Sequence, residues 1–192
     1  MKYQKLNSLQ RPVTMSTNAN FGPQTHCVLA FKGTDLFKLS VKNQQCLVNR
    51  INAGYDKIFK KYNIIVGDRL KDVTKFERDT GFEPHPDHCY LYAFIEKDPS
   101  VYQPLKQSET VKCEIFENYE IFFITEKDDS VLSLNDECIK GTTAFKPHHE
   151  YAPNLKVIEP TCFVSFLPRL GLFFLPFTER HFQTMYDLEK YV

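Results

Sequence analysis

The sequence predicts an α/β fold in which a parallel strand–helix–strand unit at the N-terminus joins a mixed or antiparallel sheet rich in aromatic residues. Two observations carry this prediction. Residues 26–68 show a short apolar run, an amphipathic pattern of helical period and a second short apolar run, and strands separated by a helix usually pair in parallel with a right-handed crossover. Aromatic side chains make up 14% of the chain, and such side chains favour pleated surfaces.

The N-terminal unit is built from three consecutive segments. The apolar run "HCVLAF" (26–31) is typical of a strand buried on both faces. A helix is predicted from Asn43, because Leu47 and Ile51 begin a row of apolar residues at helical spacing. The run "NIIVGD" (63–68) predicts the second strand. This order is Rossmann-like.

The middle of the chain shows shorter patterns. The charged segment 69–81 predicts a helix that stops at Gly81. The run "CYLYAFIE" (89–96) predicts one strand, and "VKCEIFENYEIFFITE" (111–126) predicts a hairpin that turns near Asn118.

The C-terminal part is expected to supply further strands. Residues 127–155 are rich in turn formers, whereas "KVIEPTCFVSFLP" (156–168) and "LGLFFLPF" (170–177) are apolar runs interrupted by prolines. Proline confines strands to sheet edges, so these strands should be short. Thr178 is expected to cap a last helix.

Length and charge limit the organisation of the chain. Its 192 residues suit one domain, and we expect a polar arm over residues 1–24 followed by a single α/β domain over residues 25–192. The formal net charge is zero, so broad binding of nucleic acid is not indicated.

The cysteines predict a cytoplasmic protein. Five of the six adjoin apolar runs and none forms a C-x-x-C pair, as expected of reduced, buried thiols in an intracellular protein. The N-terminus lacks the apolar segment of a signal peptide, and no apolar run approaches the length of a membrane span. A membrane partner is therefore not expected.

A ligand site is predicted at the carboxyl ends of the first two strands, where open α/β sheets bind their ligands. The two glycines there would let a ligand approach the backbone; the alternative for Asp68 is a helix cap. Neither a dinucleotide fingerprint nor a P-loop is present, so the cofactor stays unknown. The residues assigned are Lys32, Gly33, Gly67 and Arg69 as ligand-binding groups and Thr34 and Asp68 as catalytic groups.

The segment "EPHPDHC" (83–89) offers weak metal candidates. Zinc binds Cys sulfur and His nitrogen, and His85, His88 and Cys89 lie close together, with His149 available to complete a shell. Two prolines also explain the segment as a rigid loop that leads into a strand, and we expect such a loop without zinc. Cys89 as a nucleophile with a histidine base is a further alternative.

Residues 26–74 resemble the opening of the tRNA-dependent cyclodipeptide synthases, which are similar to class I aminoacyl-tRNA synthetase catalytic domains. The likeness rests on the strand, the glycine-containing loop, the amphipathic helix and Asp68-Arg69-Leu70. It implies a Rossmann-like enzyme that transfers an aminoacyl group, with Thr34 or Ser40 in place of the family's serine nucleophile and Tyr92 and Glu96 as its Tyr-x-x-x-Glu pair.

Three functions are consistent with these patterns. The first is a small intracellular enzyme of transferase type that acts on a small-molecule or aminoacyl-type substrate at the strand ends. The second is a non-enzymatic interaction protein of regulatory, viral or immunity type with a protein partner. The third is a metal-dependent hydrolase that uses the histidine clusters.

Overall fold

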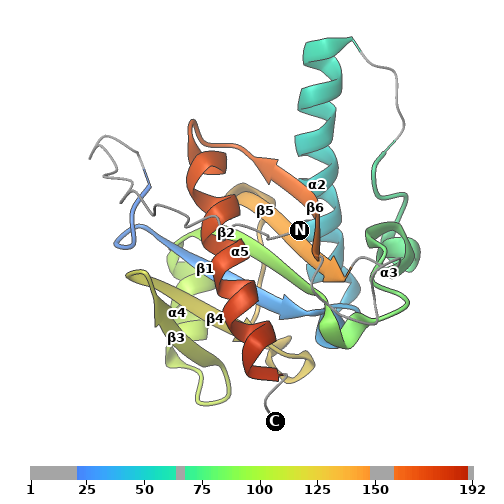
Figure 1. Ribbon diagram of the computed structural model, residues 1–192. Coiled ribbons are helices and arrows are strands. Elements are labelled where there is room, and N and C mark those ends of the chain that lie inside the picture. Colours follow the sequence, from blue (N-terminus) through green and yellow to red (C-terminus); the bar gives the residue numbers. More distant parts are fainter. Residues whose placement is uncertain (1–20, 64–67, 148–157, 190–192) are drawn as a thin grey trace, which may run out of the picture.

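The computed structural model describes residues 21–63, 68–147 and 158–189. Its six strands form one sheet in the order β3-β4-β1-β2-β5-β6, and only the β1–β4 pair runs in parallel (Figure 1). The strands are β1 (His26–Lys32), β2 (Tyr90–Glu96), β3 (Lys112–Phe116), β4 (Tyr119–Ile124), β5 (Ile139–Pro147) and β6 (Ile158–Ser165).

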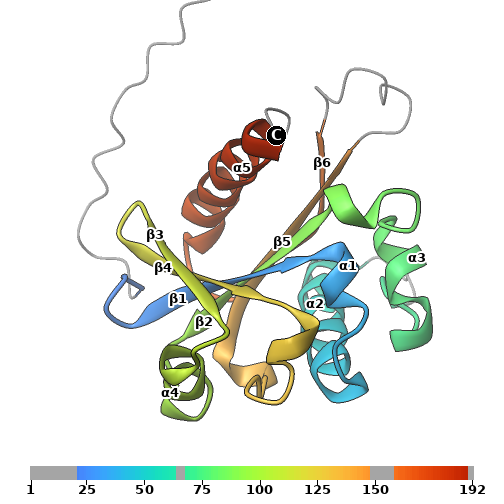
Figure 2. The same ribbon diagram turned by 90° about the horizontal axis from the view of Figure 1, so that it is seen from below.

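Helices cover both faces of this sheet. Figure 2 shows α5 crossing one face, while α1, α2 and α4 lie against the other. The helices are α1 (Gly33–Leu36), α2 (Val41–Tyr62), α3 (Phe76–Thr80), α4 (Pro99–Gln107) and α5 (Leu170–Glu189). Four 3-10 turns connect them: η1 (Val73–Lys75), η2 (Pro86–His88), η3 (Glu126–Asp128) and η4 (Asp136–Cys138).

The two faces carry different cores. The α2 face buries mainly aliphatic side chains such as Leu47 and Leu91, whereas the α5 face buries rings from the sheet and the helix, among them Phe94 and Phe174. The rings of Phe94 and Phe174 lie 5.3 Å apart in a tilted arrangement, within the range in which aromatic pairs add to burial. The predicted α/β class with a mixed, aromatic-rich sheet is therefore confirmed.

The parallel pair has a different partner from the one expected. β1 is flanked by β4 and β2, so its parallel neighbour comes from the predicted hairpin over residues 111–126. The strand expected at 63–68 falls largely on residues outside the described ranges. Periodicity indicates where strands occur, but it carries no information on which strands become neighbours.

Helix α2 is the best-predicted element. The Ser40 side chain accepts a hydrogen bond from the Asn43 N–H and caps its start, and Asn63 ends it in the left-handed region at φ 53°. A Cβ atom on Gly54 would lie 2.4 Å from the Val164 side chain of β6. Glycine therefore lets this helix pass close to the sheet.

Three other elements were predicted well. Strand β2 and the β3–β4 hairpin lie where expected, and Glu117 and Asn118 turn the hairpin with φ of 47° and 72°. The charged segment forms the short helices η1 and α3, and Gly81 stops α3 with φ 77° as predicted.

The expected strand at 170–177 is wrong, because this segment begins α5. Leu170, Phe173, Phe174 and Phe177 are all buried on the sheet, and their spacing is helical rather than alternating. Pro176 lies inside the helix, and Thr178 donates to the Phe174 carbonyl instead of capping a helix start. Strand β5 was also missed, because its sequence "IKGTTAFKP" is rich in turn formers.

The domain boundaries stay predictions. Residues 1–20 of the expected arm lie outside the described residues. Phe21 is buried, and its ring lies 5.9 Å from Phe94 and 5.8 Å from Phe173.

Candidate functional site

The carboxyl end of β1 is closed by the chain itself. The Gly33 N–H donates to the Cys89 carbonyl at 2.8 Å, and a Cβ atom on Gly33 would lie 2.5 Å from the Pro86 carbonyl oxygen. The backbone of the 86–89 loop therefore occupies the space in which a ligand was expected to approach Gly33. Lys32, the last residue of β1, is half-buried at the same end.

The parallel neighbour β4 ends beside β1, and the polar groups at this edge bind one another. The Asp35 carboxylate accepts from the Glu126 N–H at 3.2 Å, and the Lys38 ammonium lies 3.1 Å from the Glu126 carboxylate. These contacts join α1 to η3. The geometric rule that placed a site at the strand ends is sound, but here the end groups hold two turns together.

The remaining residues of the predicted strand-end site are dispersed. Gly67 lies outside the described residues, Thr34 is half-buried in α1 and Asp68 is exposed. Asp68 does not cap the next helix, because η1 begins after Asp72. The Arg69 guanidinium donates to the Asp79 carbonyl at 2.9 Å and to Thr161 at 3.4 Å. Thr161 belongs to β6, which β2 and β5 separate from β1, so Arg69 is directed away from the β1 end.

The weak metal candidates lie on and around η2. The Cys89 thiol donates to the His85 carbonyl at 3.1 Å, and burial raises the pKa of Cys89 to about 12. His88 lies 3.2 Å from the Asp87 carboxylate, and His149 is outside the described residues. Metal-binding thiols must lose their proton. Within residues 21–63, 68–147 and 158–189, no three side chains of His, Cys, Asp and Glu gather as a metal ion would require.

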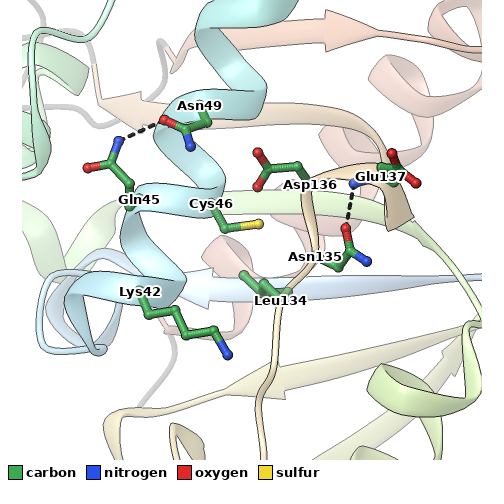
Figure 3. A pocket seen from close by; sticks show the side chains of 8 residues that line it. All are labelled: Lys42, Gln45, Cys46, Asn49, Leu134, Asn135, Asp136 and Glu137. Carbon is green, nitrogen blue, oxygen red and sulfur yellow. Dashed lines mark hydrogen bonds between the residues drawn. The ribbon is translucent and has the colours of Figure 1, made fainter.

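An open groove of about 780 Å³ lies between the first half of α2 and the segment 134–137 (Figure 3). Sequence reasoning missed it, although Lys42, Gln45 and Asn49 form a polar stripe at helical spacing. We call it the α2–η4 groove. Its lining residues are Lys42, Gln45, Cys46, Asn49, Leu134, Asn135, Asp136 and Glu137.

Hydrogen bonds from Ser40 and Asn43 fix the loop that forms the far wall. The Asp129 carboxylate accepts from the Ser40 N–H and hydroxyl, both at 3.0 Å, and from the Asn43 side chain at 2.8 Å. Asn43 also donates to the Leu132 carbonyl at 2.9 Å and accepts from the Leu134 N–H at 3.0 Å. The wall is thereby preorganised against the start of α2.

The floor of the groove is apolar with one polar pair. Cys46 and Leu134 are each 6% exposed, and the Cys46 sulfur points toward Asp136 (Figure 3). Burial and the hydrogen bond to the Asp136 carboxylate raise the pKa of Cys46 far above its usual value. Cys46 is thus a protonated thiol at neutral pH. Because only the thiolate is a strong nucleophile, Cys46 is not poised for nucleophilic chemistry.

The rim of the groove is rich in carboxamides. The Gln45 side-chain NH₂ donates to the Asn49 oxygen at 2.7 Å, and the Asn135 oxygen accepts from the Glu137 N–H at 2.9 Å. These bonds leave the Gln45 oxygen and the Asn49 and Asn135 NH₂ groups without a partner among the described contacts. The rim therefore presents both donors and acceptors.

A second polar cluster lies under α5. The Tyr92 hydroxyl is 2.9 Å from His181 Nδ1, and His181 Nε2 is 2.6 Å from the Glu114 carboxylate. Burial lowers the pKa of His181 although Glu114 opposes this shift, so the neutral ring donates from Nε2 and accepts from Tyr92. Tyr92 is fully buried. A substrate cannot reach it, and the cluster serves to satisfy buried groups.

A family model described as sporulation protein RMD6 matches residues 21–192. The chain belongs to the sporulation protein RMD6 family. This match corrects the resemblance to the cyclodipeptide synthases and class I aminoacyl-tRNA synthetases, which rested on residues 26–74 alone. No curated protein and no solved structure matches the chain.

The family match includes every residue that lines the α2–η4 groove. Among the helices that the structure describes, none combines the length and apolar character needed to cross a membrane.

Proposed function

We propose that this chain acts in sporulation as a non-enzymatic binding protein, which holds an extended segment of another polypeptide in the α2–η4 groove. The proposal rests on the hydrogen-bond donors and acceptors at the rim of the groove. Each peptide unit offers one N–H donor and one C=O acceptor, and the carboxamides of Gln45, Asn49 and Asn135 offer matching groups around an apolar floor.

The shape of the groove supports a chain rather than an enclosed small molecule. Small-molecule sites of similar volume bury most of the ligand surface, whereas this groove is open to solvent. Lys42 lies at one end, and Asp136 and Glu137 lie at the other. We therefore expect the bound segment to be acidic near Lys42 and basic near Glu137.

The protonation state of the buried thiols favours a binding function over nucleophilic catalysis by cysteine. Burial raises the pKa of Cys27 and Cys89 to about 12 and that of Cys162 to about 11, so these groups stay protonated at neutral pH. The transferase-type activity predicted at the strand ends receives no comparable support, because the groups there are engaged with each other. The interaction protein is the function that the geometry supports best.

A selection experiment tests this proposal. A phage-displayed library of random linear peptides is selected on the full chain, and the enriched peptides are then titrated against Gln45→Ala/Asn49→Ala. We expect a loss of affinity of roughly five- to thirtyfold, because removing one or two hydrogen bonds costs on the order of 1–2 kcal/mol. Both positions lie on the helix surface, where alanine supports the helix.

The matched control is Gln103→Ala, which removes an exposed carboxamide from α4. It should bind the enriched peptides as the unmodified chain does. Peptides that bind the double variant equally well, or a selection that enriches nothing, would show that the groove is not a peptide site.

A further inference from the structure

Strand β3 is an edge of the sheet, and among the described residues its outer side pairs with no other strand (Figure 2). The hairpin register fixes which backbone groups point outward. Phe116 and Tyr119 flank a two-residue turn, and such a flanking pair exchanges both of its hydrogen bonds. By alternation Lys112 and Glu114 also bond to β4, whereas Cys113 directs its N–H and C=O away from the sheet.

Three of the five side chains of β3 are also exposed, namely Lys112, Cys113 and Ile115. Cys113 and Ile115 lie on the α4 face, and Ile115 is 66% exposed. On the other face the Lys112 ammonium lies 5.1 Å from the centre of the Phe123 ring. One carboxylate oxygen of Glu114 is hydrogen-bonded to His181. Lys112 and Glu114, one basic and one acidic, therefore precede and follow Cys113 along the unpaired edge. Their side chains lie on the face opposite to that of the Cys113 side chain.

We propose that a second copy of this chain adds its β3 antiparallel to this one, so that the two sheets continue through a twofold axis beside Cys113. In this register Cys113 lies opposite the partner's Cys113. Lys112 then lies opposite the partner's Glu114, and Glu114 lies opposite the partner's Lys112.

Charge selects this register among those that the backbone permits. Outward-facing residues must pair with outward-facing residues, so the register can change only in steps that preserve this alternation. One step in one direction places Lys112 opposite Lys112, and one step in the other places Glu114 opposite Glu114. Like charges directly opposite each other destabilise a strand pair, and opposite charges stabilise it.

The same register covers the exposed apolar side chain. The residue opposite Ile115 is the partner's Val111, which precedes β3 and packs into its own core. Ile115 therefore leaves water in part because the backbone of the added strand lies alongside it. The edge carries neither proline nor a bulge, which are common devices against strand pairing. The surface is separate from the α2–η4 groove, because the groove lies beside the opposite half of the sheet, next to β5. The proposed peptide binding in the groove and the proposed pairing of β3 can therefore fail independently of each other.

Charge reversal provides the test, with sedimentation velocity over a concentration series as the readout. The unmodified chain should form a dimer, and Lys112→Glu and Glu114→Lys should each weaken it at least tenfold. An equimolar mixture of the two variants should restore the dimer, because opposite charges then meet at both contacts. A defect in folding could not be rescued by mixing.

Oxidation provides a second readout. Copper–phenanthroline removes two electrons and two protons from two facing thiols, so the unmodified chain should give a covalent dimer on a non-reducing gel, whereas Cys113→Ser should not. A chain that stays monomeric at every concentration overturns the proposal. A dimer that survives both charge reversals, or a mixture that does not recover, overturns it equally.

Discussion

At the scale of single residues, glycine marks the places where the backbone itself is packed. Neither Gly33 nor Gly54 has a positive φ, so their backbone conformations do not require glycine. A Cβ atom on either residue would nevertheless overlap a neighbouring atom at 2.5 Å or less. For Gly33 the neighbour is the carbonyl oxygen of Pro86, which cannot rotate away. The glycine that the sequence suggested as a ligand approach is therefore a packing position.

We predict that Gly33→Ala destabilises the fold by about 1–3 kcal/mol, the usual cost of overpacking a buried position. Denaturant unfolding measures this value. Gly22→Ala is the matched control, because a Cβ atom there meets nothing within 4 Å. Equal stability of the two variants would mean that the 86–89 loop can move away from Gly33 at little cost.

The cysteines show a second limit of local reasoning. All six thiols are free, and five are buried. Cys113 is the exposed one although it adjoins an apolar run, because that run is an edge strand. Cys138 is buried although the three residues before it are polar, because η4 folds back against α2.

At the scale of elements, an ionic cluster joins α4 to the sheet. Glu120 of β4 lies 2.7 Å from the Lys97 ammonium, contacts Lys106 and accepts from the Tyr102 hydroxyl at 2.8 Å. Burial alone would raise the pKa of Glu120, but the hydrogen bonds from Lys106, Lys97 and Tyr102 lower it to about 2.

The sign of this shift predicts acid sensitivity. The folded pKa of Glu120 lies below its unfolded value, so its contribution is complete above about pH 5 and is lost as the pH falls toward 2. The difference is on the order of 2–3 kcal/mol. The free energy of unfolding should therefore fall less between pH 6 and pH 3 in Glu120→Gln than in the unmodified chain. Glu109→Gln, at an exposed position, should keep the full pH dependence.

Element prediction succeeded where the sequence pattern matches the burial of the element. Helix α2 buries one face and shows the helical period, whereas strand β2 is buried on both faces and shows a continuous apolar run. The first turns of α5 were mistaken for a strand because Pro176 and the dense phenylalanines suggested an edge strand. The helical spacing of Leu170, Phe173 and Phe177 was the stronger signal.

At the scale of the whole molecule, the Tyr92–His181–Glu114 cluster links β2, α5 and β3. We predict that Tyr92→Phe lowers the free energy of unfolding by about 1–2 kcal/mol, because it leaves a buried imidazole nitrogen without its donor. Thermal and denaturant unfolding would measure the loss. Tyr62→Phe, at a residue 62% exposed on α2, should change nothing, and similar stability of both variants would argue against a structural role for the cluster.

The candidate groove belongs to this scale as well. Its two walls are 85 or more residues apart in sequence, and the contacts of Asn43 with Leu132 and Leu134 bring them together. The polar stripe on α2 was visible in the sequence. The wall that turns this stripe into a groove was not, because only the folded chain places residues 134–137 beside it.

The sequence by itself determined the class of the fold, the presence of α2, the position of β2 and the β3–β4 hairpin, because each follows from short-range periodicity and turn chemistry. Only the tertiary structure decided that β1 pairs in parallel with β4, that the 86–89 loop closes the end of β1 and that the groove forms beside α2. These features depend on contacts between residues far apart in the chain, and the residue types at each position are compatible with many such contacts. Packing of the whole molecule selects among them.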